Sequence, residues 1–218
     1  MARVTNSILE GLSGSVGDLV FYKIGDKTYT RRKPGKQSKS TKARTSDLKR
    51  RSQSVMTQTH AFLRKITHIL RFGYQNQVEG ASRQYHAAVS YTSKNCFRLE
   101  GEAKVLEIGA VKISLGTLLG PQNPRAERVP NGVEFCWTDN SGQGSAKATD
   151  EVFVCLLSVG GSGSEWEFLG SQRSAGKHVL PLPSTYSATQ WHAWIAFSQE
   201  NTWTKQRTLS DSVYLGMV

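Results

Sequence analysis

Apolar residues follow two different periods along this chain, and the change of period near residue 98 constrains the fold class. Between residues 46 and 73 they recur at seven-residue steps and fill one stripe: Leu48, Val55, Phe62, Leu63, Ile66, Ile69 and Leu70. This spacing predicts a helix of roughly 25 residues, which Ser46 can cap and Gly73 can end. The stripe fits either a core or a self-association surface. A second helix over 80–95, joined by a turn at 73–79, would complete a helical hairpin.

After residue 98 apolar and polar residues alternate, which is the period of a half-buried strand. Val133, Phe135 and Trp137 alternate in this way, residues 191–197 do the same, and 152–157 is the continuous apolar run of a buried strand. Polar turns separate these segments, and further strand fragments fall at 166–168, 178–182 and 212–215. The pattern predicts a β-sandwich of about 95 residues, of the immunoglobulin or fibronectin-like kind.

The N-terminal part begins with a predicted β-hairpin over 18–32, in which Gly25-Asp26 supplies the turn. The predicted fold class is therefore α+β: an N-terminal β-hairpin with a basic arm and a helical hairpin, followed by an antiparallel immunoglobulin/fibronectin-like β-sandwich. We assign residues 1–98 to the hairpin, arm and helices, and residues 121–218 to the sandwich. Residues 99–120 connect them through short strands at Val105–Ile108 and Val111–Ile113.

The positive charge of the chain is concentrated in its first part. The formal net charge is +11, made up of +14 for residues 1–98 and −3 for residues 99–218. Only Asp47 opposes the ten basic residues between positions 31 and 51, which are Arg31, Arg32, Lys33, Lys36, Lys39, Lys42, Arg44, Lys49, Arg50 and Arg51. This asymmetry predicts a polyanionic partner, either nucleic acid or an acidic protein surface.

Residues 33–45 contain no large apolar side chain, so the segment can bury little surface to offset the entropy of ordering it. We interpret it as an extended arm that becomes ordered against a partner, and the same composition is also typical of a solvated connector. Because the arm has no aromatic residue apart from the flanking Tyr29, the expected binding mode is sequence-independent contact with phosphates rather than base stacking.

Motifs that carry chemistry are missing from the sequence. The five His lack zinc-site spacing, and neither HExxH, CxxC nor GxSxG is present. The three Cys do not form a disulfide framework, and Cys136 and Cys155 lie in predicted strands, where we expect buried, inert thiols. The sequence therefore predicts a protein that is not an enzyme, with no catalytic residues, cofactor, metal or small-molecule substrate.

Membrane and secretory segments are also not apparent. No apolar run approaches the roughly 18 residues of a membrane helix. The N-terminus lacks the apolar stretch of a secretory signal. We therefore expect no membrane partner and no secretion.

Several segments resemble an uncharacterised family of proteins found in Bacteroidetes and their phages. The matching segments are Gly14–Tyr22, Tyr29–Pro34, Tyr85–Tyr91 with Lys94-Asn95, Phe135–Gly142 and Ser210–Gly216. Residues 38–44, Ser-Lys-Ser-Thr-Lys-Ala-Arg, replace an Asn-Pro-containing arm that is common in that family. The resemblance implies a virion-associated structural component, in a virion or the bacterial cytoplasm, and transfers no catalytic residue.

Two functions are consistent with these observations. The first is a non-enzymatic structural or assembly protein of a phage or phage-like element, which forms a homo-oligomer or a larger assembly and contacts nucleic acid or an acidic neighbour through its basic arm. The alternative is a cytoplasmic protein that binds nucleic acid without regard to sequence. A third hypothesis, glycan binding, needs exposed Trp side chains. Most of the five Trp are expected in the core, and Trp191 and Trp194 should face opposite sides of one strand, so that one of them is the candidate for exposure.

Overall fold

A computed structural model describes residues 2–3, 12–36, 38, 40, 45–78, 83–160, 163–186 and 188–218. It divides the chain into two compact units, Met1–Arg50 and Arg51–Val218, which we describe separately. Among the described residues, no helix is long and apolar enough to cross a membrane.

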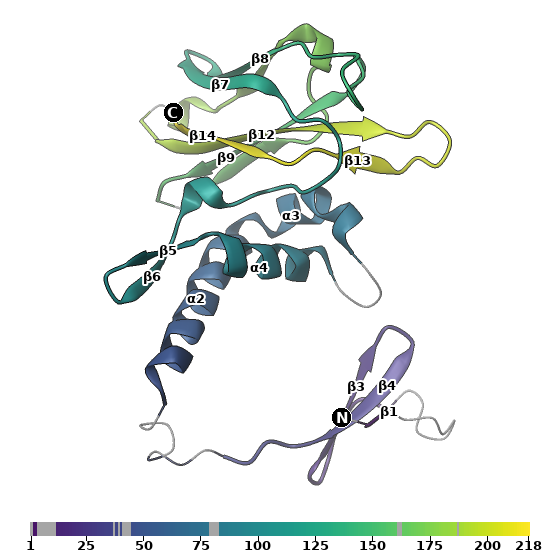
Figure 1. The fold of residues 1–218 in the computed structure, drawn as a ribbon, viewed down its shortest axis with the longest axis vertical. Helices are drawn as coiled ribbons and strands as arrows, with labels where there is room; N and C mark the ends of the chain where they lie inside the picture. Colours follow the sequence, from purple (N-terminus) through teal and green to yellow (C-terminus); the bar gives the residue numbers. More distant parts are fainter. Residues whose placement is uncertain are drawn as a thin grey trace. The chain divides into compact units, whose positions relative to one another are not determined.

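The N-terminal unit is built on a small antiparallel sheet with the strand order β1-β4-β3-β2 (Figure 1). Its strands are β1 (Ala2–Arg3), β2 (Gly14–Val16), β3 (Leu19–Ile24) and β4 (Lys27–Arg32). Strands β3 and β4 form the predicted hairpin, and Gly25 adopts the positive φ of 60° that its two-residue turn requires. The sequence did not predict β2, which pairs with β3 after a turn at Gly17.

The predicted long helix consists of two helices, α2 (Asp47–Leu63) and α3 (Thr67–Gly73), separated by a 3₁₀ turn, η1 (Arg64–Ile66). At the break, Ile66 leaves helical geometry, and the Thr67 hydroxyl donates to the Arg64 carbonyl at 3.0 Å. Hydroxyls that bond to the preceding turn compete with the helical ladder and bend helices. The Ser46 Oγ accepts a long hydrogen bond, 3.4 Å, from the Lys49 N–H, as expected of a cap.

The predicted stripe is buried over most of its length, and Leu63, Ile66, Ile69 and Leu70 are fully enclosed. Placing Leu48 on the buried stripe was wrong, because its side chain is 78 % exposed and the covered part of the helix begins only at Val55. A third helix, α4 (Gln84–Asn95), packs against α3, as the helical hairpin predicts.

The connection between helices and sandwich is less regular than expected. Strands β5 (Phe97–Glu100) and β6 (Ala103–Leu106) form a hairpin, and η3 (Ile108–Ala110) follows it. The strand predicted at Val111–Ile113 is absent among the described strands. Its backbone is instead held by side chains of a distant segment, since Ser212 Oγ accepts the Ile113 N–H at 2.8 Å.

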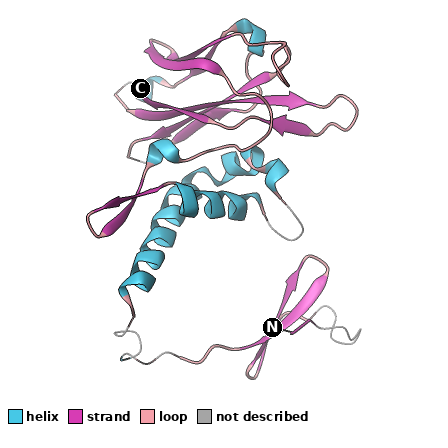
Figure 2. Cartoon of the chain, in the orientation of Figure 1, coloured by secondary structure: helices cyan, strands magenta, loops and turns pink. Residues whose placement is uncertain are grey.

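The C-terminal strands form two antiparallel sheets, as Figure 2 shows. The first sheet has the order β11-β8-β7 and contains β7 (Gln122–Val129), β8 (Gly132–Thr138) and β11 (Lys177–Pro181). The second has β9 (Glu151–Ser158) between β10 (Ser164–Glu167) and β12 (Trp191–Glu200). Both β13 (Arg207–Leu209) and β14 (Val213–Met217) pair with the other edge of β12. Buried residues of the two sheets share one core, and the predicted β-sandwich is confirmed.

Strand β7 contains a proline, Pro124. The register of β7 with β8 shifts between Gln122 and Arg125, and Asn123 has a positive φ of 48°. A proline is tolerated here because an irregular edge strand does not need its missing N–H.

Strands β9 and β12 are buried on both faces, which makes the C-terminal unit three layers deep. One core lies between the two sheets and includes Val154, Ile195 and Trp191. A second core lies between the other face of β9–β12 and the helices, and includes Trp194 and Leu70. The expectation that Trp191 or Trp194 would be exposed was therefore wrong. Because the helices share a core with the sandwich, the compact units separate at Arg50 and not at residue 98 or 120.

Within the connection between the helices and the sandwich, the backbone at one glycine approaches another segment so closely that no side chain fits there. A Cβ at Gly116 would lie 1.8 Å from the Leu209 carbonyl oxygen. We therefore expect Gly116→Ala to lower the free energy of unfolding by about 2 kcal/mol, as overpacked sites do. Urea denaturation followed by tryptophan fluorescence measures this change. Gly160→Ala is the control, because a Cβ there meets nothing within 4 Å, and equal midpoints for the two variants would contradict the packing argument.

Candidate nucleic-acid interface

The predicted basic residues are distributed over a strand, a connecting segment and a helix. Arg31 and Arg32 end β4, Lys33 and Lys36 follow it without regular structure, and the last three begin α2: Lys49, Arg50 and Arg51. Lys39, Lys42 and Arg44 lie outside the described residues. The segment 31–51 is therefore anchored at both ends by regular structure.

Within the described ranges, ion pairs with carboxylates neutralise this charge only weakly. Arg32 pairs with Asp18 at 3.7 Å, Arg50 with Asp47 at 3.7 Å, and Arg51 with Glu102 at 4.0 Å. All these side chains are substantially exposed, and exposed ion pairs contribute about 0–1 kcal/mol. The guanidinium groups therefore keep most of their electrostatic attraction for an external anion.

One face of the N-terminal hairpin combines aromatic rings with cations. Tyr22 and Tyr29 are directly opposite in the β3–β4 register, and their rings stack with centroids 5.9 Å apart and planes at 24°. The Arg31 guanidinium lies 5.8 Å from the centre of the Tyr22 ring. Alternation along β4 puts Lys27 on this face too. Stacking was not expected from the arm, which has no aromatic residue apart from the flanking Tyr29, whereas strand register brings Tyr22 next to Tyr29.

The exposed side of α2 is mostly polar and has no acidic residue beyond its first turn. A groove of about 650 Å³ runs along this side and is lined by Gln53, Met56, Thr57, His60, Ala61 and Arg64. At the edge of this groove, a hydrogen bond fixes the His60 ring, because its Nδ1 and the Tyr85 hydroxyl oxygen lie 2.8 Å apart. From Leu48 to Val78 the chain contains no Asp or Glu, so no carboxylate of this stretch offsets the basic residues of α2 and α3.

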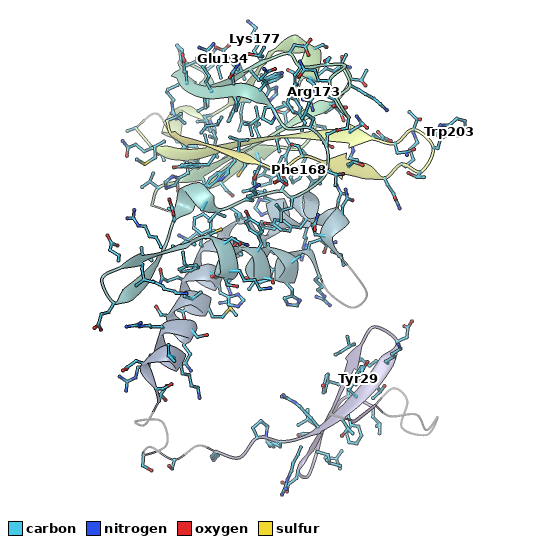
Figure 3. The ribbon with its side chains drawn as sticks, viewed as in Figure 1. Tyr29, Glu134, Phe168, Arg173, Lys177 and Trp203 are labelled. Carbon is cyan, nitrogen blue, oxygen red and sulfur yellow. The ribbon has the colours of Figure 1, made fainter. Side chains whose placement is uncertain are left out.

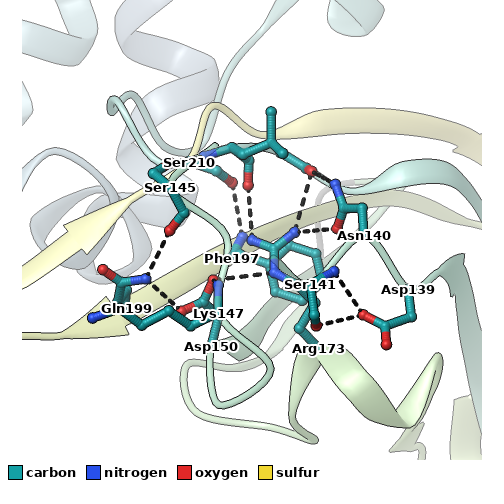
Figure 4. Close-up of polar contacts among 12 residues, drawn as sticks. Asp139, Asn140, Ser141, Ser145, Lys147, Asp150, Arg173, Phe197, Gln199 and Ser210 are labelled. Atoms are coloured by element: carbon teal, nitrogen blue, oxygen red, sulfur yellow. Dashed lines mark hydrogen bonds and ion pairs between the residues drawn. The ribbon is translucent and has the colours of Figure 1, made fainter. Parts of the chain in front are cut away.

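A polar cluster of the sandwich surrounds Arg173, which is fully buried (Figure 4). Its Nε donates to Asp150 Oδ2 at 3.1 Å and its Nη1 to Asn140 Oδ1 at 2.6 Å. Its Nη2 donates to the Leu119 carbonyl at 2.8 Å, and its guanidinium carbon lies 3.7 Å from the centre of the Phe197 ring.

Other groups of the cluster donate hydrogen bonds to the Asp150 carboxylate. Asp150 also accepts hydrogen bonds from the Lys147 N–H and from Gln199 Nε2, at 2.9 Å and 2.7 Å. Burial lowers the pKa of Arg173, and the Asp150 carboxylate opposes that shift. Because the hydrogen-bonding groups are directed at one another, this buried pair joins loops and does not present a ligand site.

The cysteines and histidines offer no metal site in the described part of the chain, where no three His, Cys, Asp or Glu side chains cluster suitably. Burial raises the pKa of Cys96 to about 11 and that of Cys155 still further, which keeps both thiols protonated near neutral pH. Cys155 is buried as expected. Cys136 is only partly buried, because it lies on the outer face of β8 between Arg125 and Lys177 of the adjacent strands.

Two of the five Trp side chains reach the surface. Trp137, Trp191 and Trp194 are buried, whereas Trp166 is 38 % and Trp203 is 93 % exposed. Trp203 lies at the tip of the β12–β13 loop (Figure 3). The Asn201 side chain shapes that loop, since its Oδ1 accepts the Trp203 N–H at 2.9 Å.

Removing the buried cation should destabilise the sandwich strongly. In Arg173→Met the Asp150 carboxylate stays buried without its counter-ion, and we expect a loss of about 3–5 kcal/mol in unfolding free energy. Urea titration measures this loss. Lys177→Met, an exposed change on the following strand, serves as the control. If the two variants unfolded at the same urea concentration, the joining role of Arg173 would be refuted.

Comparison with known proteins identifies a family without assigning an activity. A search of curated proteins and a search of solved structures each found no match to the chain. A family of unknown function, DUF6266, matches residues 11–216. This match confirms the resemblance to an uncharacterised family. Since it spans nearly the whole length, the chain belongs to the DUF6266 family of unknown function.

Proposed function

We propose that this chain is a non-enzymatic structural or assembly protein whose basic N-terminal part and helix α2 bind a polyanion, either nucleic acid or an acidic partner surface. The observation that carries the proposal is the set of cations described between Arg31 and Arg51, of which Arg32, Arg50 and Arg51 form ion pairs at 3.7–4.0 Å with exposed carboxylates. Such cations bind phosphates by releasing condensed counterions. The resemblance to proteins of phages and Bacteroidetes supports a place in a virion or virion-like assembly.

The C-terminal unit has features that suit a module for binding other proteins. Its conspicuous buried polar group, Arg173, is used to join loops, and the shifted pKa values of Cys96 and Cys155 follow from burial. Trp203 projects from a hydrogen-bonded loop, and exposed indoles are frequent anchors of protein interfaces. These features suit a protein that binds neighbours, including further copies of itself.

A cytoplasmic, sequence-independent nucleic-acid-binding protein is the second candidate. The face that carries Tyr22, Tyr29 and Arg31 favours it, because aromatic rings beside cations suit nucleic acid better than an acidic protein surface. Both candidates use the same cations. They differ in whether the C-terminal unit assembles with other proteins.

Neutralising N-terminal lysines should weaken polyanion binding specifically. We expect Lys33→Gln/Lys36→Gln/Lys49→Gln to make the slope of log K, the association constant for duplex DNA, against log salt concentration less negative by about 2–3. The reason is that each lost phosphate contact changes this slope by about 0.9. Fluorescence anisotropy with a labelled 20-base-pair duplex measures this slope.

The matched control for this experiment is Lys147→Gln/Lys177→Gln/Lys205→Gln, which removes the same charge from exposed positions of the C-terminal unit. Its slope should remain that of the unaltered protein. Equal slopes for the two triple variants would disprove the N-terminal interface. Binding to polyglutamate without binding to any nucleic acid would identify an acidic protein as the partner.

The assembly role predicts self-association that depends on Trp203. We expect the molar mass from light scattering to rise with concentration, and Trp203→Ser to reduce that rise because it removes an exposed apolar anchor. Val159→Ser, at another exposed apolar position, is the control. A strict monomer at every concentration, from which no partner is recovered, would count against assembly.

A further inference from the structure

The Tyr22–Tyr29 face is organised for more than phosphate contact. In the β3–β4 register three cross-strand pairs share this face, Val20 with Arg31, Tyr22 with Tyr29, and Ile24 with Lys27. None of these six positions holds a carboxylate. Tyr22 and Tyr29 are both half-buried, so part of each ring is accessible. The centre of the face is therefore aromatic, and cations lie on both sides of Tyr29 along β4.

An extended polynucleotide can lie along the row of these side chains. Residues two apart on a strand lie about 7 Å from each other, so Lys27, Tyr29 and Arg31 form a row roughly 14 Å long. A strand of nucleic acid lying along this row would place its phosphates near Lys27 and Arg31. Its bases would reach the tyrosine rings between them.

Hairpin stability by itself explains only part of this arrangement. Cross-strand aromatic pairs stabilise antiparallel strands, which accounts for the contact of Tyr22 with Tyr29. It does not account for two cations on the same strand and face, because like charges about 14 Å apart gain nothing from each other. A ligand that is both aromatic and anionic satisfies both components at once.

We propose that this face is a stacking platform for unpaired bases, so that the preferred ligand is single-stranded nucleic acid. The inference rests on the proposed function and specifies its ligand class. Bases in a duplex are stacked on each other and are not available to a protein ring, whereas every unpaired base offers an accessible face. The platform is therefore sequence-tolerant and selective for single strands.

The test compares three probes with the same full-length protein at about 50 mM salt, near the lower end of the range over which such affinities change steeply. The probes are a labelled thymidine oligonucleotide of 20 nucleotides, an abasic oligonucleotide of the same length, and a 20-base-pair duplex. Because the abasic probe keeps the phosphates and lacks the bases, we expect it to bind roughly tenfold more weakly than the thymidine probe.

Two variants test whether the tyrosine rings cause the difference in affinity between the thymidine and abasic probes. Tyr22→Thr/Tyr29→Thr keeps residues suited to strands and should bind the thymidine and abasic probes equally. Tyr22→Phe/Tyr29→Phe keeps both rings and should retain the tenfold preference. If the threonine variant fails to fold, the probe comparison with the unaltered protein and the phenylalanine variant still decides the question.

The outcomes separate this inference from the function on which it rests. Equal affinity of the unaltered protein for the thymidine and abasic probes would overturn the stacking platform, while the lysine-dependent binding could persist. Tighter binding to the duplex than to the thymidine probe would overturn it as well. Failure to bind any of the three probes would overturn both the platform and the nucleic-acid role.

Discussion

The C-terminal unit depends on a sheet that is apolar on both faces. Strands β9 and β12 present buried side chains alternately to the opposite sheet and to the helices, and neither face could remain in water without a large cost in free energy. The first sheet covers one face, and α3, α4 and the segment after η3 cover the other. The helical layer is therefore a structural part of the sandwich, although it precedes the sandwich in the sequence.

Polar contacts fix the position of the connections between these layers. Asp211 forms an ion pair with Lys112, and the neighbouring Ser210 and Ser212 bind the backbone or side chain of residues 113 and 114. Arg173 performs a similar task at the other core, where it binds the carbonyl groups that precede β7. Hydrophobic burial supplies most of the stabilisation, and these directional contacts select one arrangement of the loops.

The sequence was a good guide where one residue pattern corresponded to one local structure. Alternation identified β8, β9 and β12, and the turn at Gly25 identified the hairpin. It failed where the outcome depended on a distant segment. The burial of Trp194 requires helices about a hundred residues away, and the irregular backbone at Ile113 requires Ser212 as a partner.

The candidate site was predictable to a similar extent. The cations were visible as a run of residues, whereas the stacking of Tyr22 on Tyr29 follows from strand register, which composition does not reveal. Arg173 resembled an ordinary surface residue of a polar loop, and only the fold shows that acceptors from three other segments surround it.

The order of the layers along the chain has a consequence for synthesis on the ribosome. The apolar side of α3 emerges about 80 residues before β9, whose Phe153 packs against Phe72. At the usual elongation rate of about 5–20 residues per second, this surface waits roughly 4–16 s for its first partner strand. During that interval the nascent chain exposes Leu70 and its neighbours and is open to capture by chaperones or by other nascent chains.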